Sequence, residues 1–561
     1  MADALDYRQW PADKLIKRVE ELEQRLQTLT AEAKAQVSPG FARRQAKKAQ
    51  RSDASKSFDP NRYSTRYIAL KFAYLGQRYN GLEYHANNPT PLPTVEEELW
   101  KALMKTRLIF PTGKAKDGEV NWEGCEYSKC GRTDKGVSAF GQVVALKVRS
   151  SRPVPRGRRK VDTEAVSGDG YPAHEGPDEA TEDTVNEPAD EKEWDSIRDE
   201  IPYIQTLNRV LPEDIRALAW CPDVPSDFSA RFSCEERQYR YFFTNPAYAP
   251  VPGARGMAKT ADGRTLREGW LDIQAMQEAA KLLEGLHDFR NFCKMDPAKQ
   301  ISNYERRIFH ASVTEVDPAT SPVGYVGKSE FAPRGQESAT KGARIDSMHV
   351  ETPKLYTFNV NGSAFLWHQV RNMVAVLFLV GQGLEPPSIV SDLLNVEKTP
   401  TRPKYEMASD APLVLWDCIF PKRGDPERKE SLMWVRVGDQ GGRDLNKQID
   451  IDGGDGKFGR NGIMDALWTT WRLRKIDEVL AGSLIDLVAE QGRQTSLPER
   501  VGGEERRSQR VFDGGNDPRP VGKYVPVMKK ERMEHFQDLN ARWRQKKGLG
   551  EKDIKVVGTD E

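Results

Sequence analysis

The residues best suited to chemistry lie in a short polar turn between apolar segments, within YSKCGRTDKGVSAFGQVVALKV (residues 127–148). Gly131 and Gly136 bracket the turn, and glycine allows backbone conformations that other side chains forbid. Arg132 and Asp134 therefore lie on a tight loop, where a guanidinium and a carboxylate are held close together. A pair that merely stabilises the turn is an equally good interpretation, because Asp and Gly are ordinary turn residues.

The segment after the turn has the two-residue period of a strand with one buried face. Apolar residues at alternate positions are Val144, Leu146 and Val148, and they are interleaved with Val143, Ala145 and Lys147. The turn is thus predicted to lie directly before the N-terminal end of a strand.

A second candidate segment is FSARFSCEERQYRYFFTN (residues 228–245). Three aromatic residues share one face of the predicted strand, namely Tyr239, Tyr241 and Phe243. Arg237 lies beside them and Arg231 lies upstream. Basic and aromatic residues interleaved in this way suit unstacked bases and phosphates. The alternative is a strand whose aromatic side chains are simply core.

A third segment, residues 356–383, alternates first as a strand and then changes to helical spacing. Arg371 lies at the edge of the apolar helix face. Burying a guanidinium without a partner would be costly, and Asp134 is the candidate partner. An arginine that only extends to solvent is the alternative.

Composition predicts two to three domains, a folded centre and disordered additions, because 561 residues contain 38% hydrophobic and 30% charged residues. A net charge of +1 means that any nucleic-acid surface must be a local patch. The sequence contains neither a run of about 18 apolar residues nor an apolar signal core, so neither membrane insertion nor secretion is supported.

The six cysteines are scattered, which favours reduced thiols and an intracellular protein. Cys125 and Cys130 are the only close pair, and no second Cys/His pair follows at zinc-like spacing. No metal site is predicted from this spacing.

The N-terminal region (1–60) combines an apolar helical seam with a basic linker. The seam residues are Leu15, Val19, Leu22, Leu26 and Leu29, which fit either a short coiled coil or a single amphipathic helix. The basic run contains Arg43, Arg44, Lys47, Lys48 and Arg51. It suits phosphate contact or nuclear import, and a solvated linker is the alternative.

The rest of the chain is predicted as two halves of one folded domain, separated by an insertion. Residues 61–149 form the first half, 150–200 a disordered acidic insertion, 201–421 the second half with a loop insertion at 318–346, and 422–561 a partly helical, partly disordered C-terminal extension.

Two chemistries are excluded by missing motifs. A zinc nucleobase deaminase requires a His/Cys ligand set with a PCxxC turn, which the sequence lacks. A P-loop NTPase requires GxxxxGK followed by Ser or Thr, and no stretch supplies it.

GRTDKGVSA (residues 131–139) resembles the active-site motif of the TruA family of tRNA pseudouridine synthases. Companion segments resemble family segments in the family's order, namely LNRVLPEDI, FSARFS, RQYRY, AFLWHQVRN and APLVLWDCIF. The resemblance covers roughly residues 65–420 apart from the insertions. CGRTDKGVSAFGQV and HDFRNFCKMD are most similar to the eukaryotic branch that modifies uridines 38 and 39 of the anticodon stem-loop. Ser138 stands where family members often carry His, and we assign it no catalytic role.

The resemblance implies a role for each matching residue. Asp134 would be the catalytic carboxylate that enables cleavage of the C1′–N1 glycosidic bond, and Arg371 would pair with it. Tyr239 would stack on the flipped base, Leu413 would close the uracil pocket, and Arg132 would help to displace the target base. Further predicted tRNA contacts are Arg231, Arg237, Lys135, His368, Arg43, Arg44, Lys47 and Lys48.

The fold implied by the family is α/β (α+β), with a central, mainly antiparallel sheet flanked by helices and two subdomains around an active-site cleft. The resemblance also implies a homodimer that grips tRNA, no cofactor and no metal, with nucleus and/or cytoplasm as the expected location. A catalytically silent tRNA-binding protein on the same fold is the alternative, but its signature would be a degraded turn.

Overall fold

The computed structural model describes residues 60–86, 90–113, 119–153, 194–252, 256–318, 322–323, 353–439, 456–459, 462–491, 509–515 and 517–549, together with Arg18, Glu21 and Arg25. The chain divides into two compact units, residues 1–62 and 63–561. In the first unit, the three described residues of the predicted N-terminal helix are helical, and Arg18 pairs with Glu21 at 3.0 Å. The apolar seam and the predicted tRNA contacts Arg43, Arg44, Lys47 and Lys48 lie outside the described residues.

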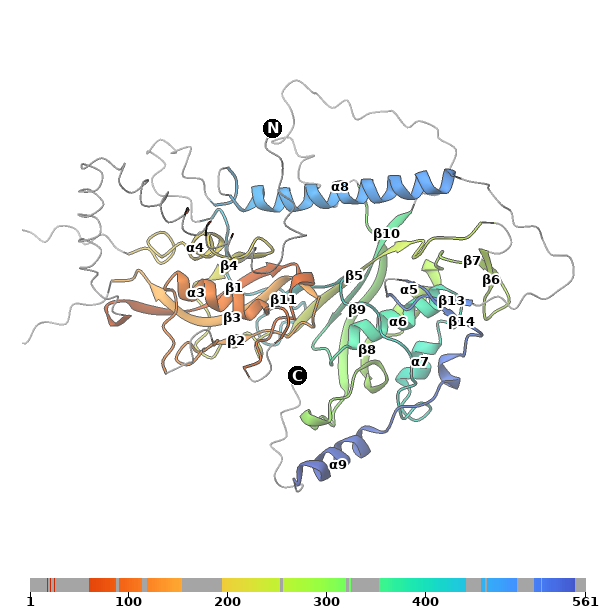
Figure 1. Cartoon of the computed structure of the whole chain (residues 1–561). Helices are drawn as coiled ribbons and strands as arrows, with labels where there is room; N and C mark the ends of the chain where they lie inside the picture. Colours follow the sequence, from red (N-terminus) through yellow and green to blue (C-terminus); the bar gives the residue numbers. More distant parts are fainter. Residues whose placement is uncertain are drawn as a thin grey trace, which may run out of the picture. The chain divides into compact units, whose positions relative to one another are not determined.

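A ten-stranded sheet forms the centre of the second unit (Figure 1). Its strand order is β12 (Val435–Arg436), β4 (Ile215–Cys221), β1 (Ser64–Tyr74), β3 (Ser138–Ser150), β11 (Leu413–Ile419), β5 (Glu236–Asn245), β10 (Lys354–Gly362), β9 (Glu305–Glu315) and β8 (Gly285–Asp288), and β2 (Ser128–Lys129) pairs with β3. Among the strand pairs of the described residues, only β3 with β11 is parallel. The predicted mainly antiparallel sheet flanked by helices is confirmed.

The remaining elements are short or peripheral. Two small ribbons pair β6 (Met257–Lys259) with β7 (Thr265–Arg267) and β13 (Gln509–Val511) with β14 (Arg519–Val521). Single 3₁₀ turns lie at Pro60–Arg62, Gly76–Arg78, Arg290–Phe292, Pro297–Lys299 and Val527–Lys529.

The first hydrophobic core packs α3 (Val95–Lys105) and α4 (Tyr203–Asn208) with β1, β3 and β4. Helix α3 begins where the sequence predicts it, because the Thr94 side chain accepts a hydrogen bond from the Glu97 amide at 3.3 Å. Leu99 and Leu103 lie one turn apart on its buried face.

The second core packs α5 (Ile273–Lys281), α6 (Gln369–Gly381) and α7 (Ile389–Leu394) with β5, β9 and β10. Helix α6 is apolar on nearly all sides and is almost wholly buried. On β5, Tyr241 and Phe243 are core residues, whereas Tyr239 packs against both cores. Tyr239 therefore stands where the two halves of the sheet meet.

The C-terminal end of the predicted acidic insertion is ordered. The Glu200 carboxylate accepts hydrogen bonds from the Ser150 hydroxyl at 2.7 Å and the Ser151 amide at 2.8 Å, and it pairs with Arg66 at 3.3 Å. These partners compensate its burial. Residues 154–193, and most of the loop predicted at 318–346, lie outside the described residues.

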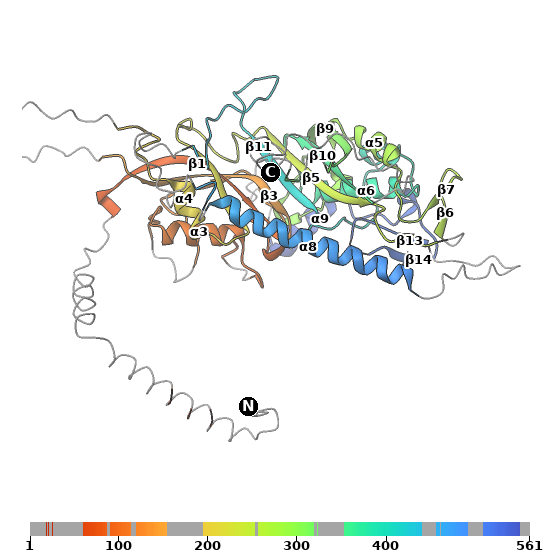
Figure 2. The ribbon, with the colours of Figure 1, turned by 90° about the horizontal axis from the view of Figure 1, so that it is seen from above.

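The C-terminal extension contributes α8 (Ile463–Glu490) and α9 (Phe536–Lys547) (Figure 2). Val527 and Phe536 pack into the second core, and the Val527 amide donates to Glu385 at 2.6 Å. Within the described ranges, no helix combines the length and the apolar composition needed to cross a membrane.

Candidate active site

The polar turn joins β2 to β3 and is held from several sides. Gly136 has a φ of +80°, and a Cβ at this position would lie 3.0 Å from the Asp410 carboxyl carbon, so glycine is required there. The Thr133 and Tyr74 hydroxyls share a buried hydrogen bond of 2.7 Å, and the Thr133 carbonyl accepts from the Leu82 amide at 3.2 Å. The turn is thus a rigid support for Asp134.

Three side chains at or just before the start of α6 converge on the Asp134 carboxylate. The Trp367 indole donates to Oδ1 at 3.1 Å. His368 Nε2 lies 3.4 Å from Oδ2, and Arg371 Nη1 lies 3.8 Å from the same oxygen. Arg371 is itself fixed, because its Nε donates to the Ala408 carbonyl at 2.8 Å. The structure therefore brings Asp134 and Arg371 together across 237 positions of sequence.

Burial raises the pKa of Asp134 above its usual value, and the Arg371 charge and the Trp367 hydrogen bond oppose this rise. Burial, with the charges of Arg371 and Lys294, lowers the pKa of His368 to about 4. His368 is therefore neutral at pH 7, so its approach to Asp134 at 3.4 Å is not an ion pair. The cationic partner of Asp134 on this side is Arg371.

Tyr239 and Leu413 lie on the two strands next to the turn. Leu413, 5% exposed, begins β11, whose next residue is in parallel register with Ser138 at the start of β3. The Tyr239 ring meets Phe365 edge to face at 5.0 Å. Burial raises the pKa of Tyr239 far above its usual value, so the phenol is protonated at neutral pH.

Arg132 forms an ion pair with Glu83. Its Nε lies 3.0 Å from a Glu83 carboxylate oxygen, and Lys129 Nζ lies 3.0 Å from the other oxygen. Arg132 is therefore paired with a residue outside the turn. Lys135 is exposed on the turn itself.

Arg237 is held by main-chain contacts. Its two terminal nitrogens donate to four main-chain carbonyls, those of Cys234, Ser363, Cys130 and Arg231, at 2.7–3.3 Å. A guanidinium used in this way ties β5 to the segment before the turn, so Arg237 has a structural role, and its tRNA contact stays a prediction.

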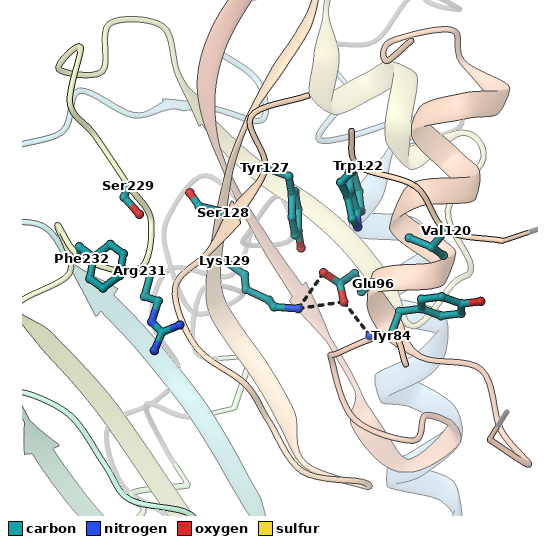
Figure 3. A pocket seen from close by; sticks show the side chains of 10 residues that line it. All are labelled: Tyr84, Glu96, Val120, Trp122, Tyr127, Ser128, Lys129, Ser229, Arg231 and Phe232. Atoms are coloured by element: carbon teal, nitrogen blue, oxygen red, sulfur yellow. Dashed lines mark hydrogen bonds and ion pairs between the residues drawn. The ribbon is translucent and has the colours of Figure 1, made fainter. Parts of the chain in front are cut away.

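Arg231 lies on an open pocket of about 340 Å³ (Figure 3). The exposed Phe232 stands beside Arg231, whose guanidinium carbon is 5.3 Å from the Phe232 ring centre. On the other side, the rings of Trp122 and Tyr127 stack at 3.9 Å. Lys129 also lines the pocket, so this surface is continuous with the Glu83 bridge to Arg132.

Sequence reasoning missed two residues beside Asp134. Trp367 remains 38% exposed although its indole binds the carboxylate, and Lys294 Nζ lies 4.3 Å from its ring centre. The available signal was a tryptophan directly before His368, at the end of a strand and ahead of a buried helix. Lys294 gave no such signal, because only the fold brings it to α6.

A family profile described as tRNA pseudouridine synthase matches residues 279–421. The human tRNA pseudouridine(38/39) synthase is 38% identical over 423 residues, covering 75% of this chain and 67% of the relative. The chain belongs to the tRNA pseudouridine synthase family. The yeast (Saccharomyces cerevisiae) tRNA pseudouridine(38/39) synthase is 37% identical over 424 residues, covering 74% and 72% of the two chains. The bacterial tRNA pseudouridine synthase A of Methylobacillus flagellatus is 30% identical over 272 residues, covering 48% and 67%.

The predicted family resemblance is confirmed, and this tRNA pseudouridine synthase is an isomerase. The profile match covers the half of the domain that carries Trp367, His368, Arg371 and Leu413. The longer matches to the human and yeast relatives agree with the predicted eukaryotic branch.

Proposed function

We propose that the enzyme converts uridine to pseudouridine at positions 38 and/or 39 in the anticodon stem-loop of tRNA. The observation that carries this proposal is Asp134, a largely buried carboxylate on a rigid turn, paired with Arg371 and hydrogen-bonded by Trp367. The names of the human and yeast relatives support the position.

Uridine and pseudouridine are isomers, so the reaction needs no co-reactant. The bond from C1′ to N1 breaks, the uracil rotates, and a bond from C1′ to C5 forms. The proton leaves C5 and N1 gains one. Asp134 is the carboxylate that enables the first step, and the nearby Arg371 charge favours its ionised form against the effect of burial.

The other site residues hold the extruded base. Tyr239 stacks on the uracil, and because its phenol is protonated at neutral pH we give it no role as a resting base. Leu413 closes the uracil pocket from β11. Arg132, 46% exposed beside Glu83, displaces the target base from the RNA stack. Extrusion costs a few kcal/mol, and stacking recovers part of that cost.

The function is tested by mapping pseudouridine on tRNA incubated with the full-length enzyme. We expect product at position 38 or 39, and none when both positions carry cytidine. Product only at another uridine would contradict the position. Tight tRNA binding without product would instead support the catalytically silent alternative.

Replacing Trp367 with Phe keeps an aromatic ring and removes the indole donor to Asp134. A hydrogen bond to a charged group contributes about 1.5–3 kcal/mol, so we expect the single-turnover rate to fall by roughly 10-fold or more. The pKa of Asp134 would rise as well, because this hydrogen bond lowers it. Rates measured across pH check this, and an unchanged rate would remove Trp367 from the site.

We propose that the pocket of Figure 3 binds a part of the tRNA next to the target uridine. Phe232, 68% exposed, offers a face for an unstacked base beside Arg231. Stacking contributes about 1–3 kcal/mol per base, so Phe232→Ala should weaken tRNA binding by roughly 5-fold or more. Met433→Ala, which removes another highly exposed apolar side chain, is the matched control. Equal affinities in a filter-binding titration would contradict the contact.

We propose that the enzyme is a homodimer, and the exposed apolar face of α8 supports this. One stripe of the helix carries Leu473, Ile476, Leu480, Leu484 and Leu487, with exposures of 49–63%. Such spacing is typical of a helix that packs on another helix. Light scattering should give a dimer mass, and Leu480→Glu should shift it toward the monomer while Lys475→Glu does not. A monomeric wild-type chain would contradict this proposal.

The proposed compartments are the nucleus and/or the cytoplasm, where tRNA is available. The basic residues 43–51 support nuclear import or tRNA contact.

A further inference from the structure

Three cysteines from separate segments of the chain converge behind the active-site turn. Cys130 directly precedes Gly131, Cys234 lies two residues before β5, and Cys418 lies in β11. Their sulfur atoms all lie within 4.8 Å of one another, and all three side chains are buried. Spacing along the chain had suggested Cys125 as the neighbour of Cys130, but Cys125 is not part of this cluster.

A partly buried cation lies beside the cluster. Arg237 donates to the main-chain carbonyls of Cys130 at 3.1 Å and Cys234 at 3.3 Å. A positive charge beside a thiol favours the thiolate form, which is the form that binds metal ions.

We propose that Cys130, Cys234 and Cys418 bind one thiophilic d¹⁰ cation, Zn²⁺ or Cu⁺, in a structural site distinct from the catalytic carboxylate. Thiolates are the ligands that these ions prefer, whereas Mg²⁺ and Ca²⁺ require oxygen. A Zn–S distance of about 2.3 Å brings sulfur atoms sharing an ion to roughly 4 Å from one another, so small side-chain rotations suffice.

Charge balance suits the divalent ion, because three thiolates, Zn²⁺ and Arg237 sum to zero. The thiols release their protons as the ion binds. A shell of three sulfur atoms suits Cu⁺, whereas Zn²⁺ would add a fourth donor.

The bound metal ion would stabilise the elements that support the active site. The ion would join three elements, namely the segment that leads into the Asp134 turn, β11, and the residues just before β5. Strand β5 carries Tyr239. The ion would touch no substrate, so its effect would be on the stability and alignment of these elements. This inference does not depend on the tRNA position proposed above.

The test uses the full-length enzyme purified without chelator, with metal content measured by mass spectrometry. The protein is then stripped and titrated separately with Zn²⁺ and with Cu⁺ against a competing chromophoric chelator. We expect one equivalent of one of these ions, release of protons when Zn²⁺ binds, and a higher thermal midpoint on binding. Co²⁺ should give thiolate charge-transfer absorption in the unaltered protein.

Cys234→Ala and Cys418→Ala should each lower metal affinity by at least roughly 10-fold. The matched controls are Cys221→Ala and Cys293→Ala, which remove buried thiols outside the cluster. If a cysteine variant fails to fold, the Co²⁺ spectrum of the unaltered protein still shows whether the three cysteines bind a metal ion.

The proposal is overturned if the stripped protein takes up no stoichiometric ion and shows no charge-transfer band. It is also overturned if the control variants lose metal as readily as the cluster variants. An intact mass lower by two hydrogens, with two cluster thiols unreactive, would show a disulfide in place of a metal site.

Discussion

Asp134→Asn will abolish pseudouridine formation and leave tRNA affinity within about 3-fold of the wild type. The amide keeps the shape of the carboxyl group but cannot supply the negative charge that the reaction requires. Loss of a residue of this kind costs on the order of 10⁴-fold or more in rate. Single-turnover assays with saturating enzyme measure the rate, and filter binding measures the affinity.

Thermal unfolding supplies the folding control for this variant. The pKa of Asp134 is raised in the folded state, so the stability that its protonated form contributes is present below the unfolded-state pKa. That contribution is lost as the pH rises through the folded-state pKa. At neutral pH the ionised side chain therefore costs stability, and the Asn variant should be no less stable than the wild type. Appreciable turnover by a folded Asn variant would refute the assignment of Asp134.

Arg371→Met will lower the rate at pH 7 by about 10²–10³-fold and move the acid limb of the pH–rate profile to higher pH. The proposed reaction requires the Asp134 carboxylate, and the Arg371 charge holds the pKa of Asp134 below the value that burial alone would set. Without that charge the pKa rises further, so a higher pH is needed for the ionised form. Single-turnover rates measured across pH report the shift.

Arg371→Lys is the matched control, because it retains the positive charge and loses the guanidinium donor to Ala408. Its acid limb should stay close to that of the wild type even if its rate falls. If the Met and Lys variants show the same profile, the charge of Arg371 does not govern the ionisation of Asp134. A purely positional role would then explain the loss of rate.

The elements that carry the site were predictable because their signals are local. The β3 strand follows from alternation after the turn, α3 from the Thr94 cap, and α6 from a long apolar stretch with helical spacing. The pairing of Asp134 with Arg371 was predicted from the cost of burying a guanidinium, together with the family resemblance. The strand and helix predictions rest on side-chain patterns within a few residues, whereas the pairing of Asp134 with Arg371 also needed the family resemblance.

Tertiary structure alone decided which side chains contact one another. The aromatic and basic pattern of β5 left Arg237 open to an RNA contact, but the fold turns it inward onto four carbonyls. Trp367 meets Asp134 only because α6 packs beneath the turn.

The sequence by itself determined the polar turn, the strands and helices around it and the family. It did not determine the partners made by packing, such as Glu83 for Arg132. The clearest case is Cys130, whose neighbours Cys234 and Cys418 are 104 and 288 positions away. The physical reason is that hydrogen-bond caps and periodicity act within a few residues, whereas contacts across a ten-stranded sheet depend on strand order and register.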